Sequence, residues 1–595
     1  MVKITVDPVT RTSGGLRVMI DLNNGSVIDA KCSGTSYRGI EQMLIGRQPM
    51  DSVYFTQRVC GMCSASHATA SANAIESLCE STAVIPKDAL IIRNILNGLA
   101  WLRSHIEHLY LIFLPDIADP MYRDMLKTSE VGNRVWNEFN GRFASPDYAL
   151  SGVESGKGYI EALKCIKLIS QAEAILGGRS PHMPAIVPGG VTCRPTGSDI
   201  YSLKECYEGI MDFLQRRLLG PTITVDEWLK NTHEPSSNMD FLWNNISDLT
   251  MGEFTPENGW GDMQLFMVFC SRMVSRDFLS GPVSMDLDTI GGYPLYDQLI
   301  GFLSYGSFYK VKDNSGNYKD GYVPLDAELS DSYEIPAGFT PGSMQNIYST
   351  SEKLDPNLIV EHVYSSFYTY GEQKSSKSPL NGETSPLTGS RDIDYGSVKY
   401  SFIKAPRYGN VPCEVGPLAR LINSREKLII DIMKMLHDKN MRGTRDRSYP
   451  MTSTYTRVLS RMQETLIVAK MLGDWIENDL GVHSGERKYY VPLEIRPKKT
   501  GSGLIEAPRG ALGHWLKLDG YGNIANYQII SPTSWNASPM DKDMKYGPME
   551  LSLLGVKTTP LGNKPGSESN PTSIYHVVRS FDPCVSCAVH TIRKS

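Results

Sequence analysis

The chain has 595 residues and a formal net charge of -5, from 60 basic and 65 acidic residues. Its length exceeds that of one ordinary hydrophobic core, so we expect one large subunit with several sub-cores and room to bury a cofactor. The balanced charge excludes the basic surface that binding to nucleic acid requires.

Residues 1–34 alternate apolar and polar side chains and contain an Asn-Asn-Gly turn at 23–25, which predicts a small antiparallel sheet. Small residues from Arg58 to Cys79 favour a closely packed helix that begins at a cysteine pair. Apolar residues at helical spacing over 87–113 predict a long core helix that Pro115 ends. The same spacing predicts further helices over 157–176, 199–219, 416–437 and 453–480.

Between residues 305 and 400, Ser, Gly, Tyr, Pro and Asp predominate, which indicates a loop-rich surface insertion with short strands. We therefore expect a mainly helical α+β fold, with a central bundle of long helices, small antiparallel sheets and peripheral loops. In this interpretation, 1–34 is a β region, 58–300 a helical core, 305–400 the insertion, and 410–595 a mixed region that closes the site.

Two Cys-X-X-Cys pairs stand near opposite ends of the chain, Cys60/Cys63 and Cys584/Cys587. Eleven cysteines are too few for a disulfide scaffold in a chain this long. Four cysteines suit a structural zinc site, but zinc ribbons bring their pairs from one local unit, roughly 15 to 20 residues apart. A site that forms only when the whole chain has folded does not stabilise a local unit, as a structural zinc site does. Nickel, iron or an iron-sulfur cluster are therefore alternatives to zinc as the bound metal.

The residues around these pairs form larger motifs, "FTQRVCGMCSASHA" and "DPCVSCAVH". Between and around them stand "DPVTR", "SGTSYRGIE", "PHMPAIVPGGV", "EVGPLAR", "EAPRGALGHW" and "YQIISPTSWNASP". In this order they resemble the large subunit of [NiFe] hydrogenases and are most similar to the respiratory, uptake-type branch. The resemblance implies a catalytic subunit that interconverts H2 with two protons and two electrons, in the oxidative direction.

The resemblance also implies a set of metal ligands. Cys60 and Cys584 would be terminal nickel ligands, and Cys63 and Cys587 would bridge nickel to an iron that carries cyanide and carbon monoxide. A magnesium ion, or a similar divalent ion, would bind a second set of groups, which are Glu41, His590 and the backbone carbonyl of Ile529.

Heterolysis of H2 needs a base near the metal, and the resemblance offers two. One is the thiolate of Cys584, and the other is Arg509, which follows Pro508 and overhangs the open metal site in the family. Asp116 and Asp582 would hold that arginine through charge-assisted hydrogen bonds.

Four more positions match the family. His67, one helical turn after Cys63, would donate a hydrogen bond to a cysteine sulfur and tune the site. Pro532 and Thr533 would surround an iron-bound cyanide, and His182 would face the nearest iron-sulfur cluster of the small subunit.

No further cysteine motif holds an electron-transfer cluster, so an obligate iron-sulfur small subunit is expected, in a heterodimer or a larger oligomer. No stretch approaches the roughly 20 apolar residues that cross a bilayer, and the N-terminus does not read as a secretory signal. We expect membrane association only through partners, on the extracytoplasmic side or in the cytoplasm, with a membrane electron acceptor reached in the same way. Maturation proteins and a C-terminal endopeptidase are also implied.

Two departures stand out. Ser13 in "RTSGG" occupies the place where many relatives have the glutamate that starts the proton exit route. Only Thr591–Ser595 follow His590, where relatives carry a removable extension, so these five residues are either an unusually short removable extension or a retained end that is arranged differently. Two alternatives to a hydrogenase remain at this point: a non-catalytic electron-transfer or scaffold homologue, and a structural zinc protein.

Overall fold

The computed structural model describes most of the chain. The described residues are 2–79, 84–119, 122, 126, 130–144, 156–233, 260–271, 285–294, 298–312, 321–322, 333–349, 351–370, 376–387, 398–440, 452–480, 487–560 and 569–589. Within them, no helix is both long enough and apolar enough to cross a membrane.

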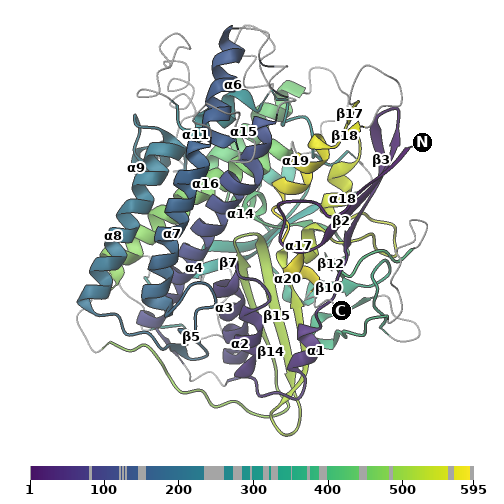
Figure 1. Ribbon diagram of the computed structural model, residues 1–595. Helices are drawn as coiled ribbons and strands as arrows, with labels where there is room; N and C mark the ends of the chain where they lie inside the picture. The colour runs from purple at the N-terminus through teal and green to yellow at the C-terminus, as the bar shows by residue number, and fades with distance from the viewer. Residues whose placement is uncertain are drawn as a thin grey trace.

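Long helices form the central bundle, as the apolar spacing predicts (Figure 1). They are α4 (Lys87–Glu107), α7 (Lys157–Gly177), α8 (Gly197–Phe213) and α16 (Thr454–Gly473). α4 continues as a π-helical turn, η1 (His108–Phe113), and a 3-10 turn, η2 (Leu114–Ala118). Pro115 lies in that last turn, where a residue without a backbone N–H costs no hydrogen bond. The bundle is therefore the frame on which the remaining elements pack.

Two predicted helices are divided. The segment from Arg58 to Cys79 forms only α3 (Ser64–Glu76), preceded by α2 (Asp51–Gln57), so the cysteine pair lies in the turn between two helices. The segment 416–437 splits into α14 (Pro417–Asn423) and α15 (Lys427–Asn440), because Arg425 adopts a left-handed backbone with φ 59°.

Shorter helices and helical turns complete this part of the fold. They are α1 (Ile40–Leu44), α6 (Glu130–Phe143), η4 (Leu214–Leu219), α9 (Val225–Thr232), α11 (Asp262–Phe269), α13 (Met344–Tyr348), η5 (Pro356–Leu358), η6 (Pro379–Asn381), η7 (Asp474–Asp479), α17 (Pro532–Asn536), α18 (Pro548–Leu553), α19 (Thr572–Ser580) and α20 (Val585–Val589).

The N-terminal strands form the predicted antiparallel sheet in the order β1 (Val2–Val6), β2 (Leu16–Asn23), β3 (Ser26–Gly34). Asn24 and Gly25 turn the chain with positive φ values of 50° and 76°. The buried face of this sheet packs against apolar residues of α18, α19 and α20. The two ends of the chain are therefore joined by one hydrophobic cluster.

The segment predicted as a surface insertion, residues 305–400, begins within a buried strand. β7 (Gly301–Tyr309) is buried along its whole length and lies between β13 (Cys413–Glu414) and β9 (Tyr333–Pro341). The other small sheets are β11 (Ser376–Lys377), β10 (Ile359–His362) and β12 (Ala405–Tyr408), and the pairs β4 (Ile85–Pro86) with β8 (Gly321–Tyr322), β5 (Ile186–Val187) with β6 (Gly190–Val191), and β17 (Thr559–Pro560) with β18 (Ser569–Asn570).

The helix that follows the first cysteine pair packs against a three-stranded sheet. This sheet has the order β14 (Thr500–Ala507), β15 (Gly510–Leu518), β16 (Ile524–Ile530), and Figure 1 shows α3 beside it. The approach is close because Gly503 has no side chain: a Cβ there would lie 2.0 Å from the Ala70 carbonyl oxygen. The absence of a side chain at Gly503 on β14 is thus required for this packing.

We predict that Gly503→Ala destabilises the protein by about 1–3 kcal/mol, because the new methyl group overpacks a backbone contact that cannot yield. Thermal unfolding followed by circular dichroism measures the effect. Gly197→Ala is the control, since a Cβ at Gly197 meets nothing within 4 Å. An unfolding temperature equal to that of Gly197→Ala would show that α3 is not held this closely.

Candidate metal centre

The two cysteine pairs meet in the folded chain. Sγ of Cys60 lies 3.2 Å from Sγ of Cys584, Cys63 lies 3.3 Å from Cys587, and Cys584 lies 2.8 Å from Cys587. All four sulfurs lie within 4.8 Å of one another, and each residue is at most 5% exposed. The prediction that the pairs form one buried site when the chain closes is confirmed.

The four thiols cannot all ionise without a positive partner. Hydrogen bonding with the other three thiols, first with Cys584, lowers the pKa of Cys60 well below its ordinary value. Hydrogen bonding with Cys584 raises the pKa of Cys63, and burial raises the pKa of Cys587. One thiolate therefore opposes the ionisation of the neighbouring thiols, because like charges repel in an apolar site. A thiophilic metal cation fits these four sulfurs.

The N-terminal segment closes over the second cysteine pair. Ser13 pairs with Cys584 in a β-bridge, and its carbonyl oxygen accepts the Ser586 N–H at 3.1 Å. A Cβ on Gly14, which has φ 90°, would lie 2.6 Å from the Ser586 nitrogen. On the other side, Thr533 Oγ1 accepts the Cys584 N–H at 2.8 Å. Thr533 therefore anchors a site cysteine through its backbone, and Pro532 opens the short helix α17 that carries it.

Arg509 stands at the tip of a hairpin that points to the cysteines. Ala507 pairs with Gly510, so Pro508 and Arg509 form the two-residue loop between β14 and β15. Arg509 donates to the carboxylate and to the carbonyl oxygen of Asp582, both at 3.0 Å. Its third nitrogen, Nη1, is buried and has no hydrogen-bond acceptor among the described residues. A ligand at the centre could accept from it.

The prediction that Asp116 also holds Arg509 is wrong. Asp116 instead accepts one hydrogen bond on each carboxylate oxygen, from Arg11 and from Arg579. The second cation near Asp582 is Arg461, whose Nη2 lies 3.8 Å from the carboxylate. Asp582 is therefore the only carboxylate on Arg509 within the described part of the chain.

Glu41 lies beside Ile529, another residue of the predicted divalent-ion site. Its Oε1 accepts the Ile529 N–H at 2.8 Å, so these two positions are adjacent. Its Oε2 accepts a hydrogen bond from Thr384 and lies 3.7 Å from the Lys404 ammonium. His590 lies outside the described residues, and the divalent-ion site as a whole stays a prediction.

The two predicted histidines are placed differently. His67 is fully buried, and its Nδ1 lies 3.0 Å from Nε2 of His514, a residue that the predicted site did not include. The bond from His67 to a cysteine sulfur stays a prediction. His182 is partly exposed; its Nδ1 lies 2.9 Å from the Gln57 carbonyl, and its N–H donates to Ser64 at the start of α3.

A sequence profile described as nickel-dependent hydrogenase matches residues 38–142, 127–278 and 297–590. The chain belongs to this family. The periplasmic [NiFeSe] hydrogenase large subunit of Desulfomicrobium baculatum is 29% identical, over 99% of this chain and 95% of that protein. The uptake hydrogenase large subunit of Rhodobacter capsulatus is 28% identical over the same shares.

A solved structure confirms the predicted fold. The reduced, active form of the [NiFeSe] hydrogenase from Desulfomicrobium baculatum superposes with a TM-score of 0.69 at 27% identity, covering 99% of this chain and 100% of that chain. The chain is thus a hydrogenase large subunit, an oxidoreductase with a nickel-iron centre, and the relatives include both the uptake and the [NiFeSe] types.

A buried arginine that the predicted site did not include supports the hairpin of this hydrogenase. Arg420 on α14 is fully buried and pairs with Glu464 and Glu506 at 2.6 Å each. It also donates to the carbonyl oxygens of Ala507, at 3.0 Å, and Pro508, at 2.9 Å. The only sequence signal for it was a charged residue in the apolar motif "EVGPLAR". Its guanidinium fixes the backbone from which Arg509 projects.

We predict that Arg420→Lys lowers H2-oxidation activity per bound nickel by about 100-fold. A lysine ammonium cannot make the several hydrogen bonds of the planar guanidinium, and a shift of the loop by roughly 1 Å misplaces Arg509. Dye reduction under H2 measures this. Arg93→Lys is the matched control, since Arg93 is equally buried but binds Glu76 and the carbonyls of Val187 and Gly190. Equal activities in the two variants would contradict a role in positioning.

Proposed function

We propose that this chain is the catalytic subunit of a [NiFe] hydrogenase that oxidises H2 to two protons and two electrons and passes the electrons to an iron-sulfur small subunit. The observation that carries the proposal is the meeting of four buried thiols below the tip of the Arg509 hairpin, in a chain of the nickel-dependent hydrogenase family. Reversal of the reaction uses the same groups.

The four sulfurs lie close enough together to hold one metal centre. In the proposed division of the ligands, Cys60 and Cys584 would hold nickel alone, and Cys63 and Cys587 would bridge nickel to iron. Cyanide and carbon monoxide would complete the coordination of the iron, near Pro532 and Thr533. When bound, these metals would supply the two-electron acceptor for the cleavage of H2.

The charge around Arg509 favours Cys584 over Arg509 as the first base. Burial acts to lower the pKa of Arg509, but the Asp582 carboxylate, followed by Cys584, Cys60 and Cys63, raises it well above its ordinary value. A guanidinium that keeps its proton cannot take another. We therefore assign the first proton to Sγ of Cys584. Arg509 then acts as a fixed cation, with its Nη1–H directed to an acceptor in the site.

The proton would leave Cys584 past Ser13. The Ser13 hydroxyl lies 3.4 Å from that of Ser586, and Ser13 is partly exposed, so water reaches this pair. A hydroxyl relays a proton but does not store one as a carboxylic acid does. The exit route proposed for this chain is thus assisted by water.

We expect Ser13→Glu to exchange H2 with D2O at least as fast as the wild type, because the carboxyl group adds a storage site to an existing route. Mass spectrometry of the HD and D2 released measures the rate. Ser13→Ala, which removes the hydroxyl without adding a charge, should exchange more slowly than either. A large loss in Ser13→Glu contradicts the proposed route.

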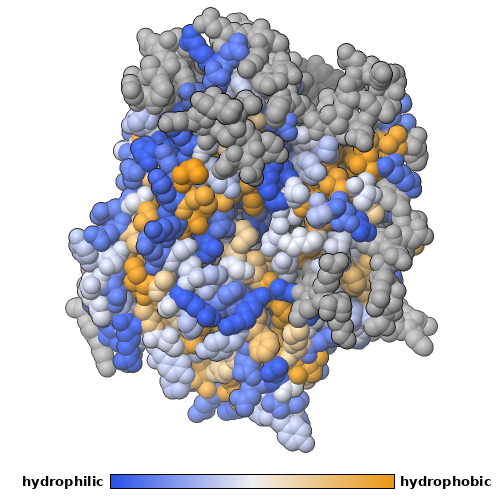
Figure 2. Space-filling view, viewed as in Figure 1, coloured by the Kyte–Doolittle hydropathy of each residue, from blue (hydrophilic) through white to orange (hydrophobic). Residues whose placement is uncertain are grey.

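The small subunit would bind over α1 and α2. Large apolar side chains are exposed there: Met43 by 40%, Ile45 by 54%, Met50 by 38% and Tyr54 by 50%. Figure 2 shows hydrophobic residues in the lower part of the visible face, where Figure 1 places these helices. An apolar patch of this kind marks an interface. The patch adjoins the first cysteine pair and the partly exposed His182. The path for electrons from the metal centre to the small subunit would therefore be short.

The remaining expectations belong to the same proposal. A magnesium ion or a similar cation would bind Glu41, the Ile529 carbonyl and His590, after maturation proteins insert the metals and an endopeptidase removes Thr591–Ser595. The intact mass of active protein tests this removal, which a retained tail contradicts. Attachment to a membrane and to a membrane electron acceptor would come through partner subunits.

We predict one nickel and one iron per active-site chain in purified protein, together with infrared bands of cyanide and carbon monoxide on that iron. Elemental analysis and infrared spectroscopy provide these measurements, with the clusters of the small subunit counted separately. Cys584→Ser should lose nickel, because a terminal thiolate is replaced by a poor ligand for a soft metal. Zinc in place of nickel would instead favour a structural site, and the absence of metal a scaffold homologue.

A further inference from the structure

One face of the long helix α16 carries charged side chains toward the segment that precedes Cys584. Arg457, Arg461 and Glu464 stand three or four residues apart, so they lie on the same side of the helix. All three are at most 3% exposed. Figure 1 shows α16 beside α19, whose end leads into Asp582 and Cys584. Charges buried in this way need partners of opposite charge.

Two of these three charges are matched by close ion pairs. Nε and Nη2 of Arg457 lie 2.8 Å and 3.0 Å from the carboxylate oxygens of Glu414. Glu464 pairs at 2.6 Å with Arg420, the residue that binds the backbone of the hairpin. The charge of Arg461, which lies between them on the helix, is not matched in this way.

Arg461 shares the carboxylate of Asp582 with Arg509. Its Nη2 lies 3.8 Å from that carboxylate, and no other carboxylate among the described residues forms an ion pair with it. At 3.8 Å the interaction is Coulombic rather than a hydrogen bond. Nη1 of Arg461 lies 3.4 Å from the Ser580 carbonyl oxygen and 3.1 Å from Nδ1 of His108. One buried carboxylate therefore faces two buried guanidinium groups.

Arg461 keeps its charge at neutral pH. Burial lowers the pKa of its guanidinium to about 10, and the Asp582 carboxylate acts against this decrease. At pH 7 the side chain is therefore a cation. Burial, together with the charge of Arg461, lowers the pKa of the neighbouring His108 to about 3, so that ring is neutral. The positive charge on this side of Asp582 is that of Arg461.

Asp582 has a backbone conformation that its surroundings must hold. Its φ of 52° lies in the left-handed region, which costs energy for a residue with a side chain. The guanidinium of Arg457 lies 3.9 Å from the ring centre of Phe581, the residue directly before it. One turn further along α16, Arg461 attracts the carboxylate. The position of Asp582, which accepts two hydrogen bonds from Arg509, therefore depends on these two arginines.

We propose that Arg461 is a positioning residue for H2 oxidation, which acts on Arg509 through the shared carboxylate of Asp582. The proposal rests on the proposed function, since the role of Arg509 is part of it. The charge of Arg461 holds the carboxylate toward α16 and so fixes the place from which Arg509 extends toward the sulfurs. Arg420, in contrast, acts through the several hydrogen bonds of its guanidinium.

Arg461→Met tests the proposal in the metal-loaded complex with the small subunit, because methionine is a long side chain without a charge. We expect the rate of H2 oxidation per nickel to fall by about 10-fold or more, since a small displacement of Arg509 weakens its action on the reaction. Arg461→Lys keeps a charge near Asp582 and should recover most of the wild-type rate. Dye reduction under H2 measures the rates, and elemental analysis measures the nickel.

Two further measurements separate positioning from a general structural effect. If Arg461 acts through Arg509, the double variant Arg461→Met/Arg509→Lys should be about as active as Arg509→Lys alone, whereas independent losses would multiply. A crystal structure of Arg461→Met should also show the Arg509 guanidinium displaced relative to the sulfur of Cys584.

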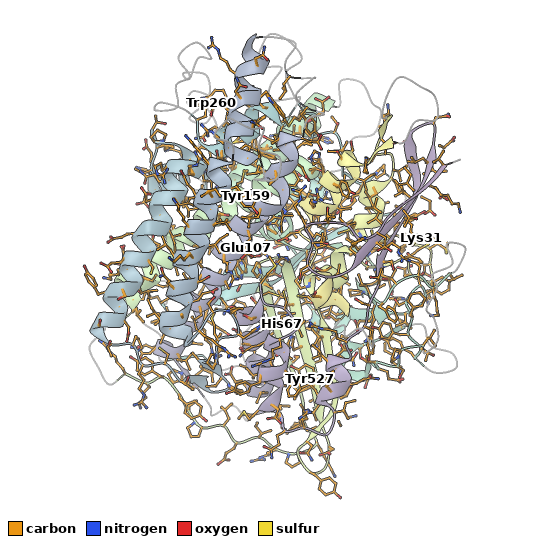
Figure 3. All side chains as sticks on the ribbon, viewed as in Figure 1. Lys31, His67, Glu107, Tyr159, Trp260 and Tyr527 are labelled. Atoms are coloured by element: carbon orange, nitrogen blue, oxygen red, sulfur yellow. The ribbon has the colours of Figure 1, made fainter. Side chains whose placement is uncertain are left out.

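Arg142→Met is the matched control. Arg142 is 9% exposed, and its Nη1 donates to the Asp262 carboxylate at 2.9 Å and to the Trp260 carbonyl oxygen at 2.8 Å. Figure 3 shows Trp260 in the upper part of the molecule and His67, which follows the first cysteine pair, in the lower part. This variant loses a buried ion pair away from the metal centre, so its rate per nickel should equal that of the wild type.

The proposal is overturned if Arg461→Met oxidises H2 at the wild-type rate, if Arg461→Lys is as slow as Arg461→Met, or if Arg142→Met loses as much. Losses that multiply in the double variant, or an Arg509 that has not moved, also overturn it. These outcomes differ from failure of the proposed function, in which the wild type itself oxidises no H2. If Arg461→Met binds no nickel, Arg461→Gln replaces it in every comparison, because its amide can still donate to the Ser580 carbonyl oxygen.

Discussion

The structure depends on holding four cysteine sulfurs from opposite ends of the chain within 4.8 Å of one another. Buried thiolates repel, so this arrangement needs a cation, and the chain must be closed before the cation can be held. The closure is visible in the hydrophobic cluster that joins the N-terminal sheet to α18, α19 and α20. A second cluster contains the four cysteines together with apolar residues of α3 and of the β14–β16 sheet. The site is therefore complete only in the closed chain.

The cation at the tip of the hairpin follows from the same constraint. Arg509 needs a rigid position above the sulfurs, and a two-residue loop that begins with proline leaves it little freedom. Two buried ion-pair systems fix that loop from opposite sides: Arg420 binds its backbone carbonyls, and Asp582 binds its guanidinium. Such pairs cost desolvation energy, and their role here is to fix the position of the loop. The site is thus supported by charges that never touch a metal ligand.

Much of this was predictable from sequence because the motifs are local. The two cysteine pairs, the proline before Arg509 and the apolar periodicity of α4 and α16 are all patterns within a few residues of each other. Three features were not predictable, because they depend on which distant residues meet. Asp116 pairs with Arg579 rather than Arg509, β7 is buried although its neighbourhood has a loop-like composition, and His514 on β15 meets His67 on α3.

X-ray absorption at the nickel edge of the reduced, active protein tests the central claim most directly. If both pairs close around nickel, the spectrum shows four sulfur scatterers and one iron neighbour. A nickel site with two sulfurs or fewer, or with nitrogen and oxygen ligands predominating, would contradict the assignment of the metal to the meeting point of the two chain ends.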